Sequence, residues 1–195
     1  MWFAAGADTA GLAVSPGRRW SGGVAPTPEE VARSLPGDDL VPAATTVMDR
    51  SFNLPAPPAE VWPWLVQLGK RRAGWYLPRW VEWWLPRPRR ALRRLDPRWQ
   101  DLAVGDVIPD WGGRDATFTV AELDPPRTLV HTSRRGRTDV SWALCLTADG
   151  AATRLHLRLR LGPVRHPRLV ATAGGLVDLL TVLGLAAGLA ERVRR

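Results

Sequence analysis

The chain has 195 residues, of which 45% are hydrophobic and 24% are charged, so it is long enough for one domain with a real core and leaves little room for a second. A formal net charge of +8 raises nucleic acid as a partner, but the arginines are dispersed and no nucleic-acid-binding motif contains them, so no nucleic acid is expected. The single cysteine, Cys145, excludes an internal disulfide and a cysteine metal cage, and it fits a cytoplasmic location.

Residues 1–44 are rich in Gly, Pro, Ala and Ser and are expected to form a flexible N-terminal extension. Within them, residues 27–34 predict a short helix, in which Thr27 is the N-cap and Pro28 occupies the first helical position. Residues 45–195 are expected to form the folded domain.

The domain begins with an alternating segment, residues 45–54, that predicts a β-strand. Residues 58–68 then predict a helix that Pro63 kinks or splits, because proline removes a backbone donor. The inward face of the strand is expected to carry Met48, Phe52 and Leu54.

Two further helices are predicted in an unusually aromatic and basic segment. Residues 77–85 predict an aromatic helix whose Trp80, Trp83 and Trp84 share one face and are expected to pack inward. Residues 88–95 predict a basic helix whose arginines stay in water.

The rest of the chain changes to strand periodicity, with turn sequences at short spacing that indicate antiparallel hairpins. In the last strand, leucines alternate with Arg154, His156, Arg158 and Arg160, which predicts one buried face and one face in water. The predicted strands are residues 104–108, 116–123, 128–133, 138–147 and 152–161.

Residues 169–190 form a long apolar segment whose only charge is Asp178. A helix gripped by the sheet is the favoured interpretation, and a membrane anchor is the alternative, because about 20 apolar residues suffice to span a bilayer. The order of elements predicts an α+β protein in which a curved antiparallel sheet wraps around a long C-terminal helix.

Five stretches resemble the SRPBCC superfamily of START-like, polyketide cyclase/dehydrase-like helix-grip proteins. They are LPGDDLVP, PAPPAEVWPWLVQLGKRRAGWY, WQDLAVGDVI, VAELDPPRTLV and DVSWALCLTADGAATRLHLRLR, within residues 35–160. The resemblance implies a seven-stranded antiparallel sheet folded around the C-terminal helix, with small helices after the first strand. It implies no catalytic residue, because members of the family share a fold but differ in their chemistry.

The function expected from these features is the binding of an apolar or aromatic small molecule, such as a lipid or a polyketide, in an internal cavity, as a carrier or sensor. One alternative is an enzyme of the polyketide cyclase/dehydratase type. Another is peripheral contact with an anionic membrane through residues 80–98. The candidate ligand-binding residues are Trp75, Tyr76, Trp80, Trp84, Trp142 and Leu144.

The candidates for acid/base work are Asp178, Asp106 and His131. Each also has a purely structural interpretation. Asp178 can be a buried carboxyl with a hydrogen-bonding partner, Asp106 can bond the backbone of a turn, and His131 can be a core residue without a chemical role. Cys145 has no basic neighbour in the sequence to activate it and is expected to fill space. No metal or nucleotide motif occurs, so no cofactor is expected.

Overall fold

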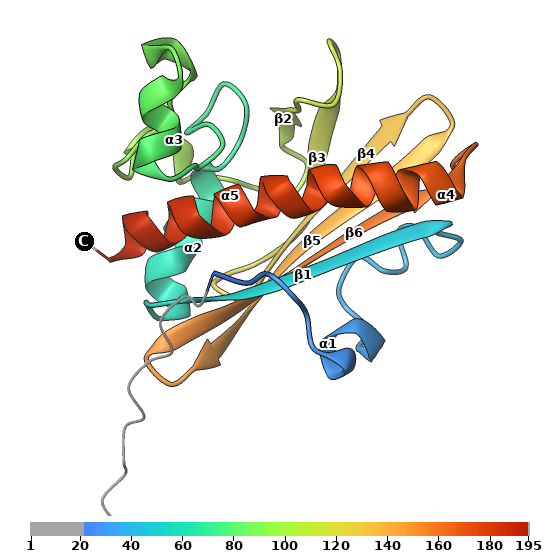
Figure 1. Ribbon diagram of the computed structural model, residues 1–195, viewed down its shortest axis with the longest axis horizontal. Helices are drawn as coiled ribbons and strands as arrows, with labels where there is room; N and C mark the ends of the chain where they lie inside the picture. The colour runs from blue at the N-terminus through green and yellow to red at the C-terminus, as the bar shows by residue number, and fades with distance from the viewer. Residues whose placement is uncertain (1–21, 195) are drawn as a thin grey trace, which may run out of the picture.

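The computed structural model describes residues 22–194, and its layers are shown in Figure 1. The C-terminal helix is continuous from Pro167 to Val193 and comprises α4, a π-helical turn and α5. In chain order the elements are α1 (Pro28–Ala32), β1 (Thr46–Leu54), α2 (Pro58–Gln67), α3 (Arg79–Trp84), 3-10 turns at Arg87–Arg89 and Pro97–Trp99, β2 (Val107–Pro109), β3 (Thr117–Asp124), β4 (Thr128–Arg135), β5 (Thr138–Asp149), β6 (Ala152–Gly162), α4 (Pro167–Leu169), the π-turn Val170–Gly174 and α5 (Gly175–Val193).

The strands form one antiparallel sheet in the order β1-β6-β5-β4-β3-β2. The predicted α+β helix-grip architecture is confirmed, because α5 lies along this sheet (Figure 1). The resemblance implied seven strands, and this expectation is wrong for residues 22–194, where the sheet has six strands. Residues 85–106 contribute turns and no strand, and three prolines in them lack the N–H group that a ladder needs: Pro86, Pro88 and Pro97.

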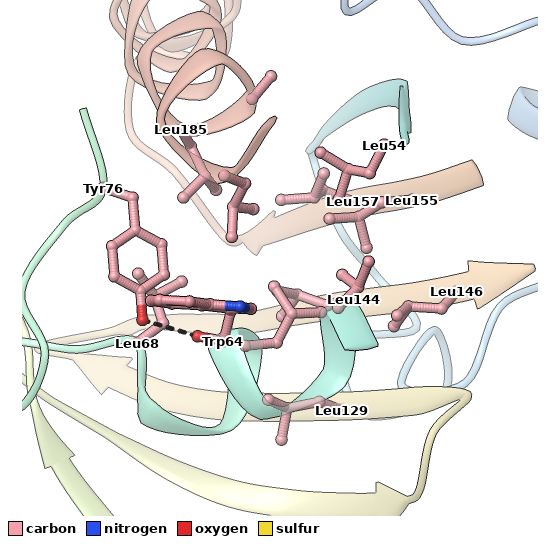
Figure 2. Packing of buried hydrophobic residues seen from close by; sticks show 14 of the residues in the cluster. Leu54, Trp64, Leu68, Tyr76, Leu129, Leu144, Leu146, Leu155, Leu157 and Leu185 are labelled. Atoms are coloured by element: carbon pink, nitrogen blue, oxygen red, sulfur yellow. Dashed lines mark hydrogen bonds between the residues drawn. The ribbon is translucent and has the colours of Figure 1, made fainter. Parts of the chain in front are cut away.

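The core lies between the leucine face of the sheet, α2 and the C-terminal half of α5. Figure 2 shows Leu144 of β5 and Leu155 and Leu157 of β6 near Leu185 of α5, with Trp64 of α2 beside them. The predicted inward face of β1 is confirmed, since Met48, Phe52 and Leu54 are all buried.

Small residues let α5 approach the chain that follows α2. A Cβ atom added to Gly188 would lie 2.6 Å from the carbonyl carbon of Tyr76, and one added to Gly184 would lie 2.7 Å from Leu77 Cδ2. These glycines therefore set how closely α5 packs on residues 76–77.

The two halves of the C-terminal helix differ in burial. Val182, Leu185 and Leu189 are buried, whereas Leu176 and Leu180 are 57% and 61% exposed. By length and composition alone the Pro167–Val193 helix is apolar enough to cross a membrane, a criterion that core helices of soluble proteins also meet. Its C-terminal half is the gripped helix that the sequence predicted.

The expectation that the arginine face of β6 lies in water is wrong. His156 and Arg158 are each 4% exposed, because residues 22–44 fold over this face of the sheet. Arg158 Nε lies 2.7 Å from Asp49 Oδ1, and its Nη1 donates to the Arg33 carbonyl oxygen at 2.7 Å.

Residues 22–44 of the expected flexible extension are therefore anchored to the sheet. Glu30 of α1 is paired with Arg154 at 2.7 Å, and the Thr27 capping box predicted from the sequence is present. Residues 1–21 lie outside the described part of the chain.

Two helix predictions are corrected. Pro63 does not split α2, which runs uninterrupted from Pro58 to Gln67. The predicted basic helix at residues 88–95 is absent. The segment begins with the 3-10 turn Arg87–Arg89, and the backbone of the residues after it is hydrogen-bonded to other parts of the chain. Leu92 N donates to the Ala73 carbonyl, and Arg192 Nε donates to the Leu92 carbonyl. These non-local bonds replace the local bonds of a helix.

Candidate functional site

A cavity of about 450 Å³ lies between the sheet and the less buried half of the C-terminal helix. Strands β1, β5 and β6 supply an apolar floor, and α5 supplies Val177, Thr181 and Val182 on the opposite side. The other lining residues are Met48, Trp75, Asp110, Trp111, Phe118, Arg135, Val140, Trp142, Leu159, Leu161, Val170, Gly174 and Asp178.

One wall of the cavity is a connected set of aromatic rings. Trp75 is stacked on Trp142, with ring centroids 6.0 Å apart and planes inclined by 26°. Trp111 meets Trp75 edge-on at 5.7 Å, and Phe118 lies 5.8 Å from Trp142. Trp75 is further fixed because its indole N–H donates to the Thr181 carbonyl on α5 at 3.3 Å. This wall offers flat apolar faces held in place by one another.

The charged groups that line the cavity occur in ion pairs. Asp178 Oδ2 lies 2.9 Å from Arg50 Nε of β1, and Arg135 at the end of β4 is paired with Asp110. Burial raises the pKa of Asp178, and the nearby Arg50 guanidinium opposes this. A partly buried carboxyl with a raised pKa is chemically suited to proton transfer.

His131 lies next to this cavity, in a smaller one of about 40 Å³ that shares Trp75, Phe118 and Trp142 with it. Its ring stacks on Trp142 at 5.5 Å, and its Nδ1 atom is buried with no hydrogen-bond partner among the described residues. Burial, reinforced by the positive charge of Arg72, lowers the pKa of His131 to about 4. The ring is therefore neutral at pH 7 and offers one donor and one acceptor.

Comparison with known proteins found no matching family model and no similar curated protein. Similar solved structures include CV1439 from Chromobacterium violaceum, which is 17% identical over 76% of this chain and 97% of that chain, with a TM-score of 0.49. DynU16, a protein in the dynemicin biosynthetic locus, is 15% identical over 76% of this chain and 47% of its own, with a TM-score of 0.48. CalU16 from Micromonospora echinospora is 19% identical over 72% of this chain and 66% of its own, with a TM-score of 0.42.

This chain has a helix-grip fold. Its sheet order and the long helix that the sheet holds define this fold, which the SRPBCC resemblance implied. Because their sequence identities and TM-scores are this low, the similar structures do not indicate a ligand or a reaction for this chain.

The cavity between the sheet and the C-terminal helix is lined by some of the predicted ligand-binding residues and not by others. Trp75 and Trp142 line it, and Leu144 lines the smaller cavity beside it. Tyr76 is fully buried in the core instead, where its hydroxyl donates to the Trp64 carbonyl at 2.9 Å (Figure 2).

The expectation that the aromatic helix packs inward is wrong. On α3, Trp80 is 71% exposed and Trp84 is 76% exposed, and neither lines the cavity. The buried side of this short helix belongs to Glu82, whose carboxylate binds Arg192 of α5 at 2.6 Å. A buried ion pair thus determines which face of α3 points inward.

Of the three acid/base candidates, two line a cavity and one does not. Asp178 lines the main cavity and His131 the smaller one. Asp106 lines neither and is a turn residue, because its Oδ2 accepts from Ala103 N at 2.9 Å. Burial raises the pKa of Cys145 to about 11, which agrees with a packing role. Within residues 22–194 no group of His, Cys, Asp and Glu is placed to hold a metal ion.

Sequence reasoning missed Trp111, Phe118 and Arg135 as cavity residues. Phe118 lies two residues before the buried Val120 in β3, so strand alternation places both on the inner face, and this is a signal that the sequence offers. Trp111 and Arg135 lie outside the regular part of any predicted strand, and only the pairing of β2, β3 and β4 brings them to the site.

Proposed function

We propose that this protein binds an apolar or flat aromatic small molecule in the cavity between the sheet and α5, as a carrier or sensor in the cytoplasm. The observation that supports it is the wall of Trp75, Trp111, Phe118 and Trp142 facing a space of about 450 Å³. Small-molecule sites commonly occupy roughly 300–1,000 Å³ and combine apolar walls with a few polar groups.

The charges around the cavity narrow the ligand class. Asp178 is paired with Arg50, and Asp110 is paired with Arg135, so each charge has an opposite charge in the protein. A strongly charged ligand would have to break one of these pairs, whereas a neutral ligand leaves both intact. We therefore infer a neutral or weakly polar ligand, such as a lipid or a polyketide-like aromatic compound.

A large side chain added to the wall of the cavity is expected to weaken binding of a neutral aromatic probe. The Thr181→Trp variant places an indole on the side of α5 that lines the cavity, and titration with N-phenyl-1-naphthylamine, followed by its fluorescence, should show at least about tenfold weaker binding. Leu180→Trp is the matched control, since Leu180 is also exposed, lies one residue away on α5 and does not line the cavity. Equal probe affinity in the wild type and both variants would contradict binding in this cavity.

A cyclase or dehydratase activity is the second candidate, and the raised pKa of Asp178 at the cavity wall favours it. If the protein acts in this way on a poly-β-ketone thioester, aromatic product should appear faster than in buffer, and Asp178→Asn should reduce the rate by about 100-fold. Asp106→Asn should leave the rate unchanged, because Asp106 lies in a turn outside the cavity. Unchanged turnover in Asp178→Asn would remove this carboxyl from the mechanism.

A further inference from the structure

Three tryptophans of α3 point into solvent. Trp80, Trp83 and Trp84 are 71%, 66% and 76% exposed, and the rings of Trp83 and Trp84 meet edge-on with centroids 5.0 Å apart. Indoles bury a large apolar area when they find a partner, so three of them exposed on one short helix indicate a surface that contacts something else. We call Trp80, Trp83 and Trp84 the indole patch.

The indole patch is held in place from behind. Glu82 is 4% exposed and binds Arg192 of α5, while Arg79 N donates to Glu191 Oε2 at 2.9 Å. At the end of α3, the Arg90 guanidinium donates to the carbonyl oxygens of Leu85 and Trp83, both at 2.9 Å. The outward direction of the indoles is therefore fixed by bonds to the rest of the fold, and Figure 1 shows α3 beside the C-terminal half of α5, off the sheet.

The surroundings of the indole patch are positively charged. Residues 79–98 contain seven arginines and two acids, and both acids, Glu82 and Asp96, are buried. The exposed basic side chains in this stretch are Arg79, Arg87, Arg89, Arg90, Arg94 and Arg98. Exposed cations without an exposed acid in the same stretch complement a negatively charged surface.

We propose that the indole patch and the arginines that follow it dock on the surface of an anionic lipid bilayer. Indoles favour the level of the lipid headgroups, where the ring is in an apolar layer and its N–H is near water, and arginines can contact lipid phosphates from the same depth. This inference goes beyond the proposed function and does not depend on the cavity.

Single-stranded nucleic acid also binds basic surfaces with aromatic rings, but it needs ring faces on which successive bases stack. Trp83 and Trp84 are inclined by 84°, so they present no pair of parallel faces. A lipid surface imposes no such requirement, which is why the geometry favours it.

The test is flotation of the full-length protein at low salt with vesicles of phosphatidylcholine, with and without phosphatidylglycerol. The wild type should float with the anionic vesicles and shift its tryptophan emission to shorter wavelength. The triple variant Trp80→Ser, Trp83→Ser, Trp84→Ser and the triple variant Arg87→Gln, Arg89→Gln, Arg94→Gln should each lower partitioning at least about tenfold. Circular dichroism should show both variants folded, since the replaced side chains are exposed.

The control variant is Leu176→Ser with Leu180→Ser, which removes exposed apolar side chains from α5 and leaves α3 intact. It should float as the wild type does. The proposal is overturned if the wild type stays with the unbound fraction, or if the α5 variant loses flotation while the indole variant keeps it. Binding of a poly-dT oligonucleotide that needs the indoles, without vesicle binding, would also overturn it.

Discussion

Replacing Glu82 by glutamine is expected to lower the free energy of unfolding by about 3–5 kcal/mol, the cost of leaving a buried charge without its partner. Glu82 Oε1 lies 2.6 Å from Arg192 Nη2, and Arg192 is 1% exposed. Glutamine preserves the shape of the side chain but removes the negative charge that compensates the buried guanidinium. Urea unfolding of the variant against the wild type measures the difference.

Glu191→Gln provides the matched control. Glu191 contacts Arg93 at 2.6 Å, close to the 2.7 Å between Glu82 and Arg93, but its side chain is 34% exposed. An ion pair that is partly open to solvent is worth less than a fully buried one, so this variant should lose much less stability than Glu82→Gln, about 1 kcal/mol. Equal losses in the two variants would show that burial of the Glu82 pair is not what makes it costly to break.

Acidification is expected to destabilise the protein through His131. Its pKa is about 4 in the folded protein, against an ordinary value of 6.5, because the ring is buried and Arg72 lies nearby. Between these two pKa values the unfolded chain takes up a proton at His131 that the folded protein does not. The stability of the folded protein is therefore unaffected by this group above pH 6.5 and decreases as the pH falls below it. The loss should reach about 3 kcal/mol near pH 4.

The contribution of His131 is measured as a difference between variants, because other groups titrate in the same range. In His131→Leu, the free energy of unfolding from urea titrations at pH 7 and pH 4.5 should fall less than in the wild type. A wild-type pH dependence in His131→Leu would mean that His131 accepts its proton in the fold as readily as in the unfolded chain.

Local patterns were sufficient to predict most of the secondary structure. The alternation in β6 and the capping residue Thr27 each specify an element without reference to the rest of the chain. The basic segment at residues 88–95 shows where this fails. Its composition favours a helix, but its backbone groups bond to Ala73, Gln67 and Arg192, which the sequence does not place nearby.

The candidate site was predictable only in part. Trp75 and Trp142 stood out by residue type, and β-strand alternation put Trp142 on the inner face. Trp80 and Trp84 are of the same type and lie on the outer surface. Residue type predicted what these side chains can bind, and it did not predict which surface they form.

The sequence by itself determined the class of this protein: its strand and helix periods, its apolar C-terminal helix and the quoted motifs all indicate a helix-grip fold. The tertiary structure decided which residues meet. Burial of the Glu82–Arg192 pair turns α3 so that its indoles face solvent, and residues 22–44 cover the arginine face of β6. Both outcomes depend on contacts between residues more than a hundred positions apart, and local periodicity carries no information about such contacts.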